Sequence, residues 1–288
     1  MKLRPTALAI LLLATAALGA DSPEFRVVEP PKSWNLDPFY KKCVLVHGLP
    51  IVSSEKVSDY ALKEAAYLIG RMAEGREDVV EAMVRNRVRV AVMAASERTV
   101  DVPEHSDLKP ASYWNRRARG LGATRRRPAT SCGEENLLNY PGDPYDAENI
   151  LIHEFAHSFH DMGLVSIDPK FDDRLEKIYR DSLAWGLWKG KYAATNRHEY
   201  WAEGVQSWFG TNRPPDHDHN DVDTREELKE YDPALAALIA ESFPNNDFTY
   251  VRPDRREEPG HLLGYDPKVA PRFAWRPEDT GKRDDPPK

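Results

Sequence analysis

Cysteine is scarce in this sequence: only two occur among 288 residues, which excludes a fold held by many disulfides and a zinc site built from four thiolates. A basic excess is missing too, because 40 Lys and Arg stand against 47 Asp and Glu, a net charge of −7. We therefore expect no nucleic-acid partner. With 41% hydrophobic and 30% charged residues, the composition is that of a globular protein rather than a disordered or multispan membrane chain.

Long hydrophobic runs are also lacking. The most apolar run, residues 7–18, is shorter than the ~20 residues that a membrane-spanning helix needs. Basic Lys2 and Arg4 precede it and small residues ending at Ala20 follow it, which is the pattern of a secretory signal peptide. We expect residues 1–20 to be cleaved off after Ala20, no membrane span, and a secreted or periplasmic mature chain.

Export would change the net charge of the mature chain and would bring its cysteines into an oxidising compartment. Without Lys2 and Arg4, 38 basic residues remain against 47 acidic ones, and the net charge becomes −9. An isolated pair of cysteines in an oxidising compartment favours a disulfide, so we expect Cys43 and Cys132 to be joined. Two separate buried thiols are the alternative.

Apolar periodicity and turn residues indicate an α+β fold. Helical spacing and alternating apolar residues predict elements at these positions: helices over 58–74, 77–86, 147–162, 171–189, 198–209 and 233–243, and strands over 44–46, 88–94 and, as a short edge strand, 120–124. The chain is divided into four parts: a signal peptide (1–20), a Pro-rich N-terminal extension (21–40), one folded body (41–247) and a Pro-rich charged tail (248–288). The body is expected to be a small mixed sheet beside a helical subdomain.

The segment 150–160 carries the chemistry. His153 and His157 are four residues apart, so a helix places both imidazoles on one face, one turn apart. Two imidazoles in this arrangement can bind one zinc ion, with Glu154 beside it as a base. Apolar residues surround these side chains, which indicates a buried helix whose polar groups need partners. Hydrogen-bonded core histidines are the alternative.

A catalytic zinc ion needs a third protein ligand and an open position. A third histidine six residues beyond His157 would require glycine and then histidine where the sequence has His160 and Gly163, so that ligand set is excluded. Glu199 and Glu203 lie four residues apart on a later predicted helix. One of them can coordinate zinc while the other accepts a hydrogen bond from a ligand histidine, and we favour Glu199 as the ligand.

These two motifs resemble those of the catalytic domain of anthrax lethal factor and its relatives, a branch of the glutamate-zincin (gluzincin) metallopeptidases. The segments concerned are His-Glu-Phe-Ala-His at 153–157 and Tyr-x6-Glu-Tyr-Trp-Ala-Glu at 192–203. The resemblance implies a zincin-like fold and one zinc ion per chain, bound by His153, His157 and Glu199. It further implies roles for three other residues: Glu154 as general base, Tyr192 in stabilising the transition state, and Glu203 in supporting a ligand.

Two further residues are expected near these ligands. Asn196 precedes Glu199 by three residues, and we expect it to contact a metal ligand. His160 follows His157 by three residues on the same helical face, so it can contact a ligand or the substrate, or be a buried structural histidine, which we favour. The resemblance also suggests that the 120–124 strand pairs with an extended peptide substrate.

The acidic loop 216–227 has oxygen side chains at alternate positions, and Glu227 stands where an EF-hand calcium loop has its last ligand. However, Asp221 occupies the position that needs glycine, and Pro214 and Pro215 leave no entering helix. Calcium binding is therefore disfavoured. We expect a polar, hydrogen-bonded loop near the cleft.

Taken together, the motifs predict an exported zinc-dependent endopeptidase acting on peptide or protein substrates. One alternative keeps the zinc ion but acts on a non-protein amide or a similar small substrate. Another is a non-catalytic secreted zinc-binding protein. The presence of Glu154 argues against the latter, because a structural zinc ion needs no base beside it. Nothing in the sequence indicates an oligomeric state.

Overall fold

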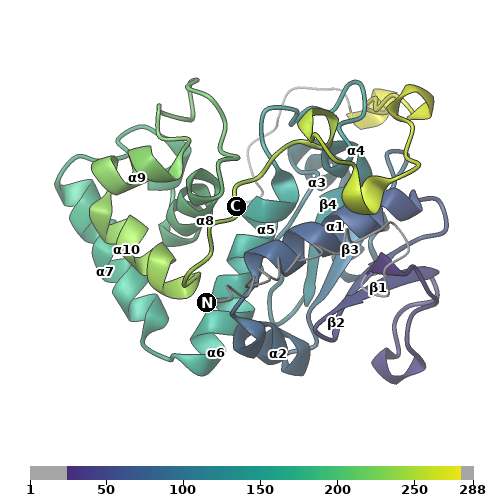
Figure 1. Ribbon diagram of the computed structural model, residues 1–288, viewed down its shortest axis with the longest axis horizontal. Helices are drawn as coiled ribbons and strands as arrows, with labels where there is room; N and C mark the ends of the chain where they lie inside the picture. Colours follow the sequence, from purple (N-terminus) through teal and green to yellow (C-terminus); the bar gives the residue numbers. More distant parts are fainter. Residues whose placement is uncertain (1–24, 280–288) are drawn as a thin grey trace, which may run out of the picture.

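The computed structural model describes residues 25–279. The predicted signal peptide at 1–20 lies outside the described residues and stays a prediction. Within the described part, a small sheet packs beside a group of helices, a mixed α+β arrangement as expected (Figure 1). A search of the described residues finds no helix with the length and apolar character needed to cross a bilayer.

The sheet has four strands in the order β1-β2-β3-β4. Their bounds are Lys42–Val46 (β1), Leu49–Ser53 (β2), Arg89–Met93 (β3) and Ala129–Gly133 (β4). The first two form an antiparallel hairpin, and the other two neighbouring pairs are parallel, so the sheet is mixed as expected. Strand β2 was not expected, because Pro50 disfavours a strand. The structure accommodates it because Pro50 pairs only with Leu45, ahead of the register with β3 that starts at Ile51.

Ten α-helices lie in the described residues. Their bounds are Asp59–Met72 (α1), Glu77–Arg85 (α2), Ala111–Arg117 (α3), Glu134–Leu137 (α4), Ile150–Ser158 (α5), Val165–Ile167 (α6), Phe171–Ala184 (α7), Arg197–Trp208 (α8), Arg225–Tyr231 (α9) and Pro233–Ser242 (α10). Helices α1, α2, α8 and α10 match their predicted ranges closely. Helix α7 ends earlier than predicted, since Gly186 just beyond it adopts a positive φ of 82°.

Helix α5 joins the two parts of the fold. Figure 1 shows α1 and α2 beside the sheet, helices α7 to α10 grouped at the other side, and α5 between them. Helix α5 packs on β4 through its sheet side and on α8 through its opposite side. Its side chains Leu151, Ile152 and Phe155 are fully buried in the main hydrophobic core. Burial on both sides fixes the orientation of the helix, and with it the polar side chains at 153, 154 and 157.

The predicted disulfide is wrong. Cys43 lies in β1 and Cys132 in β4, at the two opposite edges of the sheet, and both are buried free thiols. Three strand spacings separate them by about 14 Å, whereas a disulfide needs Cα atoms within about 7 Å. The register aligns Cys43 across the sheet with Ser131, the neighbour of Cys132, so the two thiols also point to opposite faces.

The segment 120–124 does not form the expected edge strand. Its contact with the sheet is a single bridge between Leu121 and Ser131, in which the Ser131 amide donates to the Leu121 carbonyl at 2.8 Å. The glycines on either side of Leu121 favour an irregular backbone over a strand. Strand β4 is thus the edge of the sheet on this side.

The C-terminal segment 248–279 is anchored to the body by buried charges. Glu64 on α1 is fully buried and forms hydrogen bonds with Arg256 at 2.6 and 2.7 Å and with His261 at 2.7 Å. A second buried ion pair joins Arg98 to Asp279 at 2.7 Å. In Figure 1 this segment, coloured yellow-green to yellow, runs across the sheet side of the molecule.

Candidate metal centre

Helix α5 presents His153 and His157 to the space between the two parts of the fold. The helix begins at Asn149, whose side chain accepts a hydrogen bond from the Ile152 amide at 3.0 Å and so satisfies one of the free amides of the first turn. The i, i+4 spacing places the two imidazoles on one face, with ring centroids 4.8 Å apart.

Helix α8 supplies the third side chain. Asn196 is its N-cap, and its Oδ1 accepts hydrogen bonds from the amides of His198 at 2.8 Å and Glu199 at 3.0 Å. Its side chain thus contacts Glu199 through the backbone amide of that residue, and it starts the helix that carries Glu199. The Trp201 indole donates to the Ala156 carbonyl at 2.9 Å, which fixes α8 against α5.

The three expected ligands converge. Nε2 of His153 lies 3.1 Å from Nε2 of His157 and 3.2 Å from Oε2 of Glu199. The remaining separation, between His157 Nε2 and Glu199 Oε2, is 3.4 Å. Three ligands at tetrahedral positions about 2.0–2.1 Å from a zinc ion would be about 3.3–3.4 Å apart, so this set of donors fits zinc.

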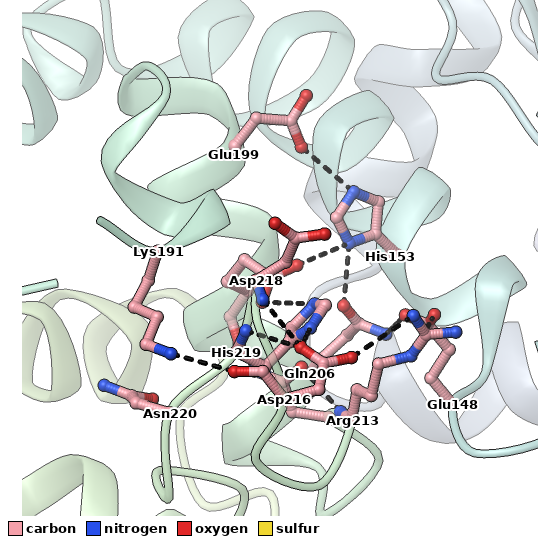
Figure 2. A network of polar contacts seen from close by, with 12 residues as sticks. Glu148, His153, Lys191, Glu199, Gln206, Arg213, Asp216, Asp218, His219 and Asn220 are labelled. Carbon is pink, nitrogen blue, oxygen red and sulfur yellow. Dashed lines mark hydrogen bonds and ion pairs between the residues drawn. The ribbon is translucent and has the colours of Figure 1, made fainter. Parts of the chain in front are cut away.

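The hydrogen bond at Nδ1 of His153 indicates which of its two ring nitrogens carries the proton. Nδ1 lies 2.7 Å from Oε1 of Gln206, whose own amide nitrogen donates to Glu148 at 3.2 Å (Figure 2). Since the amide oxygen of Gln206 can only accept, Nδ1 of His153 carries the proton. In that tautomer, Nε2 of His153 has a lone pair that a metal ion between it, His157 and Glu199 could accept. Nε2 of His157 and Oε2 of Glu199 can direct lone pairs toward the same point, so the three side chains could hold one cation.

Glu203 is buried behind His153. Its Oε1 is 3.7 Å from Nδ1 of His153, farther than the Gln206 oxygen, and its Oε2 is 3.6 Å from Nε2 of His219. Burial raises the pKa of Glu203, partly offset by the two imidazoles. Glu203 thus lies on the side of His153 opposite Glu199, where it can orient the ring but does not join the three converging ligands.

A ring of polar contacts links His153 to the loop after α8, as Figure 2 shows. From Glu148 the contacts continue to Arg213 at 3.3 Å, from Arg213 to Asp216 at 3.6 Å, and from Asp216 to Nδ1 of His219 at 2.8 Å. His219 then returns to Glu203. Within the acidic loop 216–227, Asp216 and His219 are thus part of a polar, hydrogen-bonded network beside the cleft, as expected.

Glu154 and Tyr192 line the same cavity of about 140 Å³ as His153. Burial raises the pKa of Glu154, which makes its carboxylate a stronger base. Burial and the Glu199 carboxylate also raise the pKa of Tyr192, although the guanidinium of Arg117 offsets part of this rise. The Tyr192 hydroxyl is therefore protonated at neutral pH and able to donate a hydrogen bond into the cavity.

The charge state of Glu199 suits a metal ligand. Burial alone would raise its pKa, but in the ion-free chain the adjacent His153 and His157 imidazoles lower it well below the usual range of a glutamate. The side chain is consequently ionised at neutral pH. An ionised carboxylate is the form that coordinates zinc.

Two glycines allow the segment 120–122 to lie directly against α5. A Cβ atom at Gly120 would come within 2.8 Å of Cγ of Glu154, and one at Gly122 within 2.7 Å of Cβ of His157. A side chain at either position would force the neighbouring face of α5 to shift. The predicted position of this segment beside the cleft is thus confirmed, although it is not a strand.

The calcium site considered from the sequence has a different explanation. Oε2 of Glu227 accepts hydrogen bonds from the Thr224 amide at 3.0 Å and from its hydroxyl at 2.7 Å, while the Glu227 amide donates to the Thr224 hydroxyl. This reciprocal arrangement is a capping box that begins α9. Glu227 therefore caps α9 and is not free to act as the last ligand of a calcium-binding loop.

His160 does not lie at the metal centre. Its side chain is fully buried, with ring centroids 5.4 Å from Phe171 and 6.0 Å from Trp201. The cause is the π-helical turn Phe159–Leu164, which follows α5 and changes the direction in which later side chains point. The favoured interpretation, a buried histidine, agrees with this environment.

Gln206, Arg117 and His219 were not identified from the sequence. Gln206 had a usable signal, because it follows Glu199 by seven residues and Glu203 by three, and so shares their face of α8. Arg117 and His219 reach the cavity from α3 and from an irregular loop. Their proximity depends on the tertiary fold, for which local spacing gives no indication.

Neither a family model nor a curated protein matches this chain. Among solved structures, one that matches is the PRO-PRO endopeptidase PPEP-2 from Paenibacillus alvei, with 15% sequence identity and a TM-score of 0.38. The match covers 66% of this chain and 94% of that one. A likeness this weak carries no conclusion about fold or function. The resemblance to the lethal factor catalytic domain therefore stays a prediction made from two motifs.

Proposed function

We propose that this protein is a zinc-dependent peptidase whose zinc ion is bound by His153, His157 and Glu199. The observation that carries the proposal is the convergence of three ligand atoms at 3.1, 3.2 and 3.4 Å beside a cavity that Glu154 and Tyr192 also line. On this proposal the fold is of the zincin type, with the sheet beside α5 and the glutamate ligand on α8.

A zinc ion bound there would supply Lewis-acid chemistry, acidifying water and polarising a substrate carbonyl. The chain itself supplies the base. Glu154 follows the first ligand directly and lines the cavity, so its carboxylate can accept a proton from an attacking water and pass it to the leaving nitrogen. Its raised pKa supports both steps, since proton transfer is most efficient when the pKa lies near the working pH.

The negative charge that develops on the carbonyl oxygen needs hydrogen-bond donors. The hydroxyl of Tyr192 is a protonated donor on the cavity wall, and Arg117 adds a positive charge near it. Backbone contacts keep Tyr192 in place, since its amide donates to the Asp218 carbonyl at 2.7 Å. We assign Tyr192 to stabilisation of the transition state and Arg117 to the same region of the cleft.

We further propose that the substrate is an extended peptide bound along the segment 120–124, and that the protein is exported. The glycines at 120 and 122 bring this backbone against Glu154 and His157, where a peptide lying beside it would pass the base. Export follows from the predicted signal peptide. N-terminal sequencing of the chain recovered outside the cytoplasm tests it, with Asp21 expected as the first residue.

The experiment compares cleavage of a peptide library by the zinc-loaded protein and by Glu154→Gln. Glu226→Gln is the matched control. Glu226 is an exposed side chain on α9, and in the sequence it lies far from the proposed zinc ligands. We expect Glu154→Gln to keep its zinc ion and lose cleavage, while the control keeps both. Cleavage that persists in Glu154→Gln would contradict the proposal. A zinc-loaded wild-type protein that cleaves no peptide but hydrolyses a non-protein amide would favour the amidase alternative instead.

A further inference from the structure

A second group of metal-ligating side chains lies where the π-helical turn after α5 meets the start of α8. His160 and Asp161 come from the turn and His198 from α8, and each offers one ligand atom such that all three lie within 4.8 Å of one another. None of these residues belongs to the ligand set of the proposed catalytic zinc ion. π-helical turns within α-helices occur frequently at functional sites.

The environment of His160 is the most unusual feature of this group. The imidazole is fully buried, and neither of its ring nitrogens completes a hydrogen bond. Nδ1 faces Oδ1 of Asp161 at 3.5 Å, and Nε2 faces Oδ1 of Asp172 at 3.2 Å. A neutral imidazole has a single N–H and cannot donate to both carboxylates. One nitrogen must therefore direct a lone pair at a carboxylate oxygen.

A cation near Nδ1 removes this conflict. The Asp161 carboxylate faces both imidazoles: its Oδ2 lies 3.4 Å from Nδ1 of His198 and its Oδ1 lies 3.5 Å from Nδ1 of His160. The two imidazole rings have centroids 5.4 Å apart, and an ion bound between them would draw their ligand atoms closer together. Nε2 of His160 is then free to donate to Asp172.

Asp172, the carboxylate that faces Nε2 of His160, is itself held in place. Arg197 binds Asp172 through two hydrogen bonds, at 2.8 and 2.9 Å. A metal-bound imidazole whose other nitrogen donates to a fixed carboxylate is a recurrent arrangement in metal sites, because the carboxylate sets the tautomer and orients the ring. The chain thus offers both the ligands and the group that supports one of them.

We propose that His160, Asp161 and His198 bind a second divalent transition-metal ion, with zinc as the expected occupant. Two imidazoles and one carboxylate are donors that zinc prefers, and water can complete the coordination. An ion can reach the site, since the Asp161 and His198 side chains are about one-third exposed (34% and 33%). This inference goes beyond the proposed peptidase activity and does not depend on it.

The position of the second site indicates a structural role. The first site joins α5 to α8 through Glu199, and the second joins the turn after α5 to the neighbouring residue, His198. An ion at the second site would fix the start of α8, and with it the position of Glu199. We therefore expect it to raise the thermal stability of the folded chain, because a ligand that binds only the native state stabilises it.

The test measures zinc per chain by equilibrium dialysis against micromolar zinc, followed by mass spectrometry of the metal. We expect about two zinc ions in the full chain and one in the double variant His153→Ala/His157→Ala, in which the first site is destroyed. Asp161→Asn added to that double variant should remove the remaining ion. His217→Ala added instead is the control, because His217 is almost fully exposed (95%) in the nearby loop and belongs to neither site.

Single variants keep the test decisive if the double variant does not fold. In the otherwise unchanged chain, Asp161→Asn and His198→Gln alter partly exposed side chains, and each should lower the zinc content from two to one while His217→Ala leaves it at two. One zinc ion in the full chain, or two in Asp161→Asn and His198→Gln, would overturn the inference. Because zinc content is the readout, a failure of the proposed peptidase activity would appear separately, in the cleavage assay.

Discussion

Nδ1 of His153 lies 2.7 Å from Oε1 of Gln206, closer than the 3.7 Å to the carboxylate of Glu203. The amide rather than the carboxylate therefore fixes the tautomer of this ligand. We predict that Gln206→Ala weakens zinc binding by about 10–100-fold, the range observed when such supporting hydrogen bonds are removed. A competition titration with a chromophoric zinc chelator measures the change.

Glu203→Gln separates the two supporting groups. If the assignment to Gln206 is correct, this conservative change affects zinc affinity less than Gln206→Ala does. A larger loss in Glu203→Gln would show that the carboxylate is the main support of His153, contrary to the geometry.

Tyr192→Phe removes the donor from the cavity wall but keeps the ring. We predict a fall in kcat of about 100-fold, because loss of one oxyanion donor typically costs two to three orders of magnitude. KM and zinc content should change little, since Tyr192 is not among the converging ligands. Steady-state kinetics on a peptide found in the library screen measures this. A fall confined to zinc content would place Tyr192 in the support of the metal instead.

The two cysteines should react as free thiols. Burial raises the pKa of Cys43 to about 12 and raises that of Cys132 as well, so both should resist alkylation in the native state. In denaturant without reductant, mass spectrometry should show two alkylated cysteines. Alkylation that appears only after reduction would mean that a disulfide had formed, which the strand order does not permit.

Glu64 is predicted to be a main anchor of the C-terminal segment. Burial alone would raise its pKa, but hydrogen bonds from His261 and Arg256 lower it below the usual value. The stabilisation is therefore present above the pKa of an unfolded glutamate, about 4.3, and is lost as the pH falls through the lower folded value. Acid unfolding should be less steep in Glu64→Gln.

At neutral pH, Glu64→Gln should destabilise the fold by about 3–5 kcal/mol, because it leaves Arg256 without its buried counter-charge. Urea unfolding measures the difference. Glu81→Gln on α2 is the control, since this exposed side chain has only a 3.9 Å contact with Arg85 and should change stability by less than about 0.5 kcal/mol. If both variants lowered the free energy of unfolding by the same amount, Glu64 would not be an anchor of the C-terminal segment.

The convergence of the three proposed ligands was largely predictable because it depends on helical spacing. His153 and His157 share a face whatever the rest of the fold does, and Glu199 needed only a second helix packed on the first. Its convergence on the two histidines agrees with the predicted ligand set. Arg117 was missed for the opposite reason, since its approach to the cavity depends on how α3 is placed in space.

The disulfide failed as a prediction because sequence alone does not give strand order. Export and an isolated pair of cysteines favoured a bond, but β1 and β4 lie at opposite edges with their thiols on opposite faces. Strand β2 was missed through Pro50, whose effect depends on which neighbour pairs with it. The π-helical turn at 159–164 likewise has no simple pattern in sequence, yet it decides where His160 points.

The central claim is that one zinc ion is bound by His153, His157 and Glu199. Anomalous diffraction at the zinc edge, on crystals of the zinc-loaded protein, tests it most directly. We predict a peak about 2.0–2.2 Å from Nε2 of both histidines and from a carboxylate oxygen of Glu199. A peak coordinated by Glu203 in place of Glu199, or no peak at these histidines, would contradict the account.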